Sequence, residues 1–203
     1  GFYGTGKLLK SDIMIELASV LSFSAIKNND KVGLLLFSDI IEKYIPPKKG
    51  KSHVLRVIRE MIFHKANDRE TDIGFALDHI QKMLKRKSII FLLSDFWDNS
   101  FYNSMQRISK KHDLINIKIL DQSEIKLPYM GLIKVHDVEN KNSLWVDTSK
   151  NDSHKSISDL LIKNMRNINN FCKSNNIDII NVNTKHGYVE PLVQFFNNRL
   201  RRK

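Results

Sequence analysis

Cysteine is almost absent from this sequence, since Cys172 is the only one. An intramolecular disulfide is therefore excluded, and a reducing, cytoplasmic location is expected. Long apolar runs are lacking as well, because the longest cover only residues 32–37 and 89–93. A membrane span needs about 20 consecutive apolar residues, so the sequence predicts no span. The 203 residues are nevertheless enough to bury a core without disulfides or structural metals.

Acidic residues are scarce relative to basic ones. Asp and Glu number 22 against 33 Lys and Arg, which gives a net charge of +11. The densest basic stretch includes Lys48, Lys49, Lys51 and Arg69, and we expect it to attract an acidic partner. A basic nucleic-acid-binding module is the alternative, although no known RNA- or DNA-binding motif is found and the aromatic residues mostly follow core periodicity. Solvated Lys and Arg on exposed helix faces would explain the same pattern.

Signatures of several enzyme classes are missing. The seven His residues show no metal-ligand spacing, which argues against zinc. No Gly-x-Ser-x-Gly motif and no Cys–His pairing supports nucleophilic catalysis. The opening Gly-rich segment matches the sequence pattern of a phosphate-binding loop up to Lys7. Leu8, however, occupies the position where that pattern needs a Ser or Thr to bind magnesium. These motifs therefore give no positive support for an enzymatic function.

Hydrophobic periodicity predicts an alternation of helices and strands. The expected helices cover residues 11–28, 52–64, 72–84, 101–111, 157–175 and 189–201, and the expected strands cover 31–37, 41–45, 88–94, 114–120 and 177–182, with a hairpin at 133–138 and 144–146. This order is typical of an α/β fold with a mostly parallel sheet and helices on both faces. No linker or repeat divides the chain, so a single domain over residues 1–203 is expected.

Three details of these elements are also predicted. The continuous apolar run at 31–37 is expected to be covered on both faces, as in a parallel sheet. Pro46 and Pro47 are expected to end the strand before them, which would lie at a sheet edge. In the last helix, Leu192, Phe195 and Phe196 are expected to face inward.

Oxygen-bearing side chains lie where the strands of such a sheet end. Asp95 directly follows the strand at 88–94, and Thr71 lies in the loop before the helix at 72–84. Ligands of open α/β sheets bind at the carboxyl ends of the strands, where a hydroxyl and a carboxylate could share Mg²⁺. Thr71 with Asp72 could equally be a helix N-cap. A metal-dependent hydrolase built on Asp95 and Asp121 is a further alternative, but no general base accompanies them.

An ordered set of short motifs covers nearly the whole chain. It includes the segments 28–39, 46–53, 71–73, 94–96, 111–113, 121–128, 131–132, 137–139, 146–148, 188–192 and 196–199. Together they resemble the bacterial family called domain of unknown function fifty-eight. Members of that family carry a von Willebrand factor type A-like domain and are commonly encoded beside MoxR-type AAA+ ATPases. The resemblance therefore implies a three-layer, doubly wound, mostly parallel sheet of von Willebrand factor A type.

The resemblance also implies a metal-ion-dependent adhesion site, formed by an Asp-x-Ser-x-Ser segment, a distant Thr and a distant Asp. Thr71 matches the Thr and Asp95 matches the later Asp, whereas the Asp-x-Ser-x-Ser segment is absent. In relatives that segment ends the first central strand, directly before the stretch matched here by residues 3–5. We therefore expect the C-terminal part of a longer protein, which lacks that strand and by itself binds Mg²⁺ weakly or not at all.

The function that the resemblance implies is a non-enzymatic, metal-ion-dependent protein-interaction module. In the intact parent, Mg²⁺ held by Thr71, Asp95 and the absent segment would take its last ligand from a carboxylate of the partner. The expected partner is a MoxR-type AAA+ ATPase or its client, and the basic stretch would steer it toward the ion site. Nucleic-acid binding through the basic residues is the alternative.

Overall fold

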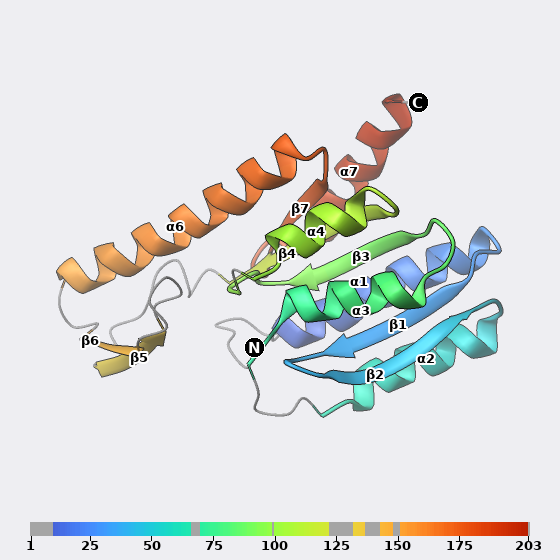
Figure 1. Ribbon diagram of the computed structural model, residues 1–203, viewed down its shortest axis with the longest axis horizontal. Coiled ribbons are helices and arrows are strands. Elements are labelled where there is room, and N and C mark those ends of the chain that lie inside the picture. Colours follow the sequence, from blue (N-terminus) through green and yellow to red (C-terminus); the bar gives the residue numbers. More distant parts are fainter. Residues whose placement is uncertain are drawn as a thin grey trace. The chain divides into compact units, whose positions relative to one another are not determined.

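The computed structural model describes residues 10–65, 70–98, 100–121, 132–136, 143–147 and 151–202, with side chains at 10–65, 70–98, 100–121 and 162–202. The chain forms two compact units, and Figure 1 labels their helices and strands. The parallel-sheet unit comprises Gly1–Lys10, Ile89–Asn99 and Asp113–Lys203, and the β1–β2 unit comprises Ser11–Ser88 and Ser100–His112. The expectation of a single domain stays a prediction.

The parallel-sheet unit is built on three parallel strands in the order β3-β4-β7. Its elements are β3 (Ile89–Ser94), β4 (Asp113–Leu120), β5 (Leu132–His136), β6 (Ser143–Asp147), α6 (Asn151–Ser174), β7 (Asp178–Asn183) and α7 (Val189–Arg201). β5 and β6 form the predicted antiparallel hairpin. The central strand β4 is buried at six of its eight positions, which is typical of a parallel strand covered on both faces. The predicted α/β class with parallel strands is thus confirmed.

The β1–β2 unit pairs β1 (Val32–Phe37) with β2 (Ile41–Lys48) in antiparallel orientation. Its helices are α1 (Lys10–Lys27), whose first residue Lys10 belongs to the parallel-sheet unit, α2 (Lys51–Phe63), α3 (Ile73–Met83) and α4 (Tyr102–Ser109). Apolar residues recur at helical spacing along α2, so one face of that helix is buried. Val57 and Met61 from this face cluster with Ile45 of β2 and form the core of the unit.

Two strand predictions for this unit need correction. The prediction that the run at 31–37 is covered on both faces in a parallel sheet is wrong, because its described partner β2 is antiparallel and β1 is only half-buried. Pro46 and Pro47 lie within β2 and do not end it. The register shifts at this point, so both prolines lie opposite Gly33 and interrupt few ladder hydrogen bonds. A Cβ on Gly33 would lie 2.9 Å from the carbonyl oxygen of Ile45, so this close approach requires glycine.

Two apolar strands have an open edge. Within the described residues, β1 is hydrogen-bonded only to β2, and β3 only to β4. An open edge presents backbone N–H and C=O groups that can pair with a further strand. β2 and β7 also lie at sheet edges, but β1 and β3 are the more apolar edge strands, so a further strand could be added to either of them.

Among the helices that the structure describes, none is long and apolar enough to cross a bilayer.

Candidate functional site

The turn after β3 holds Asp95 at the carboxyl end of that strand. Ser94 Oγ accepts a hydrogen bond from the backbone N–H of Phe96 at 3.0 Å, and Phe96 has a φ of 58°. This left-handed conformation costs about 1–2 kcal/mol for a residue with a Cβ. The Phe96 ring is fully buried, whereas the Asp95 side chain is 34% exposed. Burial and the hydrogen bond thus stabilise a strained turn, as is common at functional sites.

A buried polar chain supports this turn from β4 and α6. Asn164 Nδ2 donates to the carbonyl oxygen of Phe96 at 3.2 Å, and Asn164 Oδ1 accepts from Lys118 Nζ at 2.7 Å. Lys118 is only 2% exposed. Burying the Lys118 ammonium is costly unless polar groups surround it. Asn164 therefore connects this charge on the central strand β4 to the backbone of the turn at Phe96.

Asp121 follows β4 as Asp95 follows β3, but its carboxylate is enclosed. Asp121 is 1% exposed, and its Oδ2 accepts a hydrogen bond from Thr184 Oγ1 at 2.9 Å. The backbone N–H of Thr184 also donates to the carbonyl oxygen of Leu120 at 3.0 Å. Asp121 therefore ties the ends of β4 and β7 together, and its burial does not favour the hydrolase alternative.

A cation of the chain itself lies beside Asp95. Lys10 Nζ is 3.8 Å from Asp95 Oδ2, and the Lys10 side chain is only 3% exposed. The carboxylate that was predicted to hold Mg²⁺ is thus already close to an ammonium group. Among the described residues, no group of three His, Cys, Asp or Glu side chains is placed to hold a metal ion.

Thr71 belongs to the β1–β2 unit, and Asp95 belongs to the parallel-sheet unit. The N-cap of α3 is Asp72, whose Oδ1 accepts hydrogen bonds from Phe75 N at 2.8 Å and from Ser100 Oγ at 3.3 Å. The helix-cap interpretation is therefore confirmed for Asp72. Thr71 is exposed. The joint use of Thr71 and Asp95 as metal ligands stays a prediction.

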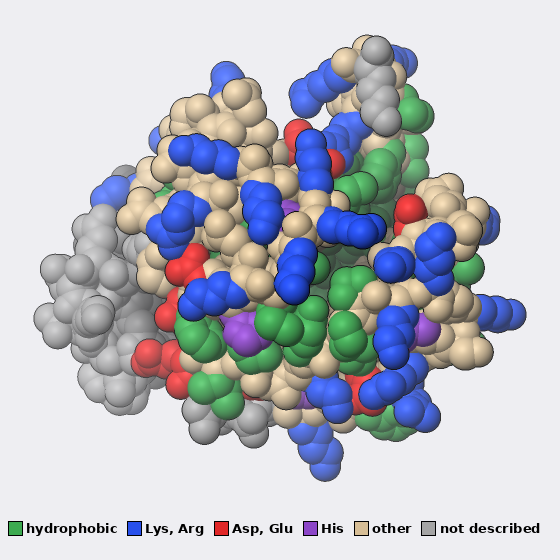
Figure 2. Space-filling model, turned by 45° about the vertical axis from the view of Figure 1, so that its right-hand side comes forward, with side chains coloured by type: hydrophobic (Ala, Val, Ile, Leu, Met, Phe, Trp, Pro, Cys, Tyr) green, Lys and Arg blue, Asp and Glu red, His purple; other side chains and the backbone are tan. Residues whose placement is uncertain are grey.

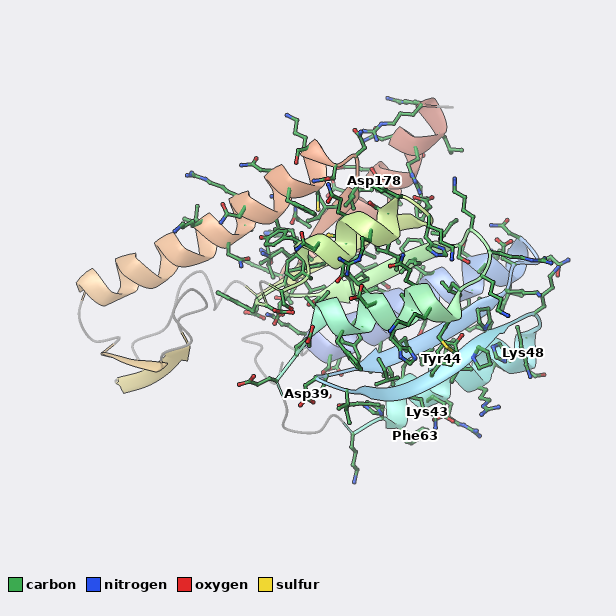
Figure 3. All side chains as sticks on the ribbon, in the orientation of Figure 1. Asp39, Lys43, Tyr44, Lys48, Phe63 and Asp178 are labelled. Carbon is green, nitrogen blue, oxygen red and sulfur yellow. The ribbon has the colours of Figure 1, made fainter. Side chains whose placement is uncertain are left out.

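The predicted partner-binding lysines surround the connection between β2 and α2. Lys48, Lys49 and Lys51 are all exposed, and Gly50 between them adopts a φ of 105° as the N-cap of α2. Arg69 lies outside the described residues. Figure 2 shows many Lys and Arg side chains and few Asp or Glu side chains on the visible face, and Figure 3 places Lys48 where β2 ends.

The amino ends of the parallel strands carry an ion-pair network that the sequence analysis did not predict. Arg199 of α7 binds Asp113 at the start of β4 (2.7 Å) and Asp178 at the start of β7 (3.1 Å). Its guanidinium carbon also lies 5.3 Å from the ring centroid of Phe195. The hydrogen bond that Arg199 donates to the Asp113 carboxylate raises the pKa of Arg199 further above its ordinary value. This network fixes the end of α7 at the edge of the sheet opposite Asp95.

A cavity of about 650 Å³ adjoins this network and is lined by Cys172 and Phe196 among others. The prediction that Phe196 faces the core is wrong, because its side chain is 39% exposed at this cavity, whereas Leu192 is buried as predicted. Cys172 is fully buried, and burial raises the pKa of its thiol, so the thiolate is disfavoured.

His112 makes the stability of this chain depend on pH. It is 2% exposed, and neither ring nitrogen has a hydrogen-bond partner within the described residues. Burial, with a smaller contribution from the charge of Lys111, lowers the pKa of His112. Below about pH 6.5 the His112 imidazole therefore binds a proton more readily in the unfolded chain than in the folded chain. The free energy of unfolding falls as the pH drops through that range.

Urea unfolding between pH 8 and pH 5 measures this effect. We expect the wild type to lose up to about 1.4 kcal/mol of stability per pH unit from this group below about pH 6.5. The variant His112→Leu should lose less stability over the same range, because it has no imidazole to protonate. An equal loss in both proteins would contradict the prediction.

Comparison with known proteins identifies the family. Residues 1–166 match the family described as "Protein of unknown function DUF58". This chain belongs to the DUF58 family. Its curated relatives include the uncharacterized proteins Mb1516 of Mycobacterium bovis and Rv1480 of Mycobacterium tuberculosis, each 24% identical over 142 residues, which cover 68% of this chain and 44% of the relative. The chain thus matches less than half the length of these relatives, and no solved structure gives a significant match.

The family predicted from the ordered motifs is confirmed, but the supports of the Asp95 turn in this DUF58 chain were missed. Lys118 could have been found, because it is a charged residue within an otherwise mostly apolar strand. Asn164 carries no such signal, since it is one of several Asn residues in a polar helix. Its contacts reach 46 and 68 residues back along the chain, beyond any local pattern.

Proposed function

We propose that this chain is part of a non-enzymatic protein-interaction module in which the turn after β3 contacts the partner. The observation that carries the proposal is the Asp95 turn. It combines a non-glycine residue at positive φ, a partly exposed carboxylate and a buried polar support from Lys118 and Asn164. Such an arrangement holds one carboxylate in a fixed position at the sheet edge where α/β folds bind ligands.

The fold that we infer is the von Willebrand factor A type, completed by a further central strand. The open edges of β1 and β3 support this inference, because each is an apolar strand with one described neighbour. A strand added at such an edge would satisfy its backbone donors and acceptors. The DUF58 match is compatible with the same arrangement.

The described residues do not by themselves fit a Mg²⁺ ion. Mg²⁺ prefers six oxygen ligands in octahedral geometry, whereas Asp95 has the Lys10 ammonium 3.8 Å away and Thr71 lies in the other unit. The ion-dependent form of the function therefore requires further donors, which the family resemblance assigns to an Asp-x-Ser-x-Ser segment. Within this proposal the partner is a MoxR-type AAA+ ATPase or its client.

Calorimetry with MgCl₂ tests the ion-binding behaviour of this chain. We expect no saturable Mg²⁺ binding, because the available oxygen donors are too few and an ammonium group already lies beside Asp95. The variant Asp95→Ala should give the same flat titration. A tight site in the wild type that disappears in Asp95→Ala would contradict this prediction.

The experiment that tests the function is capture of a purified MoxR-type ATPase by a DUF58 protein that contains this chain and an Asp-x-Ser-x-Ser segment. Capture in Mg²⁺ that is lost in EDTA supports the ion-dependent module. Capture that is equal in Mg²⁺ and EDTA contradicts ion dependence, and no capture under either condition contradicts this choice of partner.

The second candidate function is nucleic-acid binding, which the net charge of +11 and the exposed Lys48, Lys49 and Lys51 favour. Binding through phosphate contacts weakens steeply as salt rises, because counterions are released. A gel-shift titration that shows no binding, or binding independent of salt, would dismiss this alternative.

A further inference from the structure

The helix α2 has an outer face with an unusual composition. Three large apolar side chains are exposed there: Leu55 at 47%, Ile62 at 55% and Phe63 at 74%. The opposite face of α2 is buried in the core of the β1–β2 unit, so the helix is already anchored. A surface helix normally carries polar side chains on its outer face, and clustered apolar side chains at this position indicate a contact with another molecule.

The anchoring contacts of α2 lie on other sides of the helix. His53 Nε2 is 2.9 Å from the carbonyl oxygen of Val32, and the ring of His64 bonds to Glu42. Lys43 of β2 pairs with Glu60 at 3.1 Å. These contacts hold both ends of α2 on the β1–β2 sheet. The outer face of the helix therefore has a fixed position relative to that sheet. Figure 3 shows Phe63 at the end of α2 remote from Lys48.

The charge around this face has one sign. Residues 48–63 contain five Lys or Arg, and Glu60, which is already paired, is the sole acidic residue among them. Neither Arg56 nor Arg59 has a carboxylate within ion-pair distance among the described residues, and both are exposed. A partner that covers this face must therefore supply negative charge together with apolar surface.

The order of side chains across the face favours a protein over a membrane or a nucleic acid. At about 100° per residue, Leu55 and Ile62 form one stripe, Arg56 and Phe63 form a second, and Arg59 lies between the two. Insertion of both stripes into lipid would also bury the Arg59 guanidinium, which is costly. Phosphates would pair with the arginines but would leave Leu55 and Ile62 facing water or a charged backbone.

We propose that the outer face of α2 binds an amphipathic helix of an acidic protein, whose apolar residues cover Leu55, Ile62 and Phe63 and whose carboxylates pair with Arg56 and Arg59. The flanking Lys48, Lys49 and Lys51 raise the association rate with such a partner. This surface needs no metal ion, so it acts separately from the Asp95 turn.

The probe for this proposal is a synthetic helical peptide of about three heptads, with Leu at the a and d positions and Glu at the flanking positions. Fluorescence anisotropy with the full chain is measured in EDTA at about 150 mM ionic strength, which removes any ion-dependent binding and screens weak charge effects. A peptide with the same Leu positions and Lys in place of Glu is the charge control.

Two pairs of variants distinguish the loss of a contact on the α2 face from the effect of the same kind of substitution elsewhere on the surface. Ile62→Ser removes an exposed apolar side chain from α2, and Val193→Ser removes one of similar exposure (54%) from α7. Arg59→Glu reverses a charge on α2, and Arg201→Glu makes the same change on α7. We expect each α2 variant to weaken binding of the acidic peptide about tenfold or more, and each α7 variant to change it less than about twofold.

Several results would overturn the proposal. One is the absence of binding to the acidic peptide, and another is an equal loss in the α2 and α7 variants. Single-stranded RNA or phosphatidylserine vesicles are measured in parallel with the same variants. If they bind in an α2-dependent manner and the peptide does not, the occupant is a nucleic acid or a membrane. Self-association that Ile62→Ser abolishes, without peptide binding, would identify the occupant as a second copy of the chain.

Discussion

Substituting Asp95→Ala is expected to abolish Mg²⁺-dependent capture of a MoxR-type ATPase by a DUF58 protein that carries this chain together with an Asp-x-Ser-x-Ser segment. Asp95 is the partly exposed carboxylate on the fixed turn after β3. Removing one partner of a desolvated charge contact costs about 2–5 kcal/mol, which corresponds to a loss of about 30-fold to several thousand-fold in affinity. The measurement is the dissociation constant in Mg²⁺ for the wild type and the variant.

The matched control is Asp98→Ala, which removes the same charge three residues further along the same loop. Asp98→Ala should retain most of the affinity, because the proposal gives this carboxylate no contact with the ion or the partner. Unchanged capture by Asp95→Ala would refute the ion-bridged interaction. Equal losses in both variants would show that the loop acts through its overall charge and not through Asp95.

The substitution Asn164→Leu is expected to destabilise the parallel-sheet unit by about 3 kcal/mol. It removes the acceptor for the buried Lys118 ammonium and the donor for the carbonyl oxygen of Phe96. Loss of a hydrogen bond to a charged group costs about 1.5–3 kcal/mol, and loss of the second hydrogen bond, to Phe96, adds to this cost. Urea unfolding can be followed by the fluorescence of Trp97, which directly follows Phe96 in the turn.

Two further substitutions make this measurement specific. Asn164→Asp keeps an acceptor for Lys118 and loses only the donor to Phe96, so it should cost clearly less than Asn164→Leu. Asn167→Leu makes the same change at an exposed position on α6 and should have little effect on stability. If Asn164→Leu were no more destabilising than Asn167→Leu, the buried polar chain would not stabilise the turn.

Local features of this fold could be predicted well from the sequence. The helix at 189–201 and the strand at 88–94 follow from apolar spacing, and the structure has them as α7 and β3 to within one residue. Such periodicity reports which residues share a face, and this property depends on neighbours a few positions away. The same reasoning failed for Phe196, since the side of the helix that meets the sheet depends on distant elements.

The candidate site was only partly predictable. Asp95 was found because a carboxylate directly after a buried strand has a fixed place at the sheet edge. Its neighbours could not be found in this way, because the contact between Lys10 and Asp95 joins residues that are far apart in the sequence. The left-handed conformation of Phe96 was also missed, since no sequence rule predicts positive φ for a Phe.

The segments of the two units alternate along the chain. The residues of one unit are therefore all synthesised before the other unit is complete. The β1–β2 unit draws on two segments, Ser11–Ser88 and Ser100–His112, so all of its residues are available once His112 has been made. The parallel sheet must wait for β7, which ends at Asn183. During this interval β3 and the apolar β4 have been synthesised without the last strand of their sheet. Nascent chains stalled in this interval should therefore be a natural substrate for chaperones that bind exposed apolar strands.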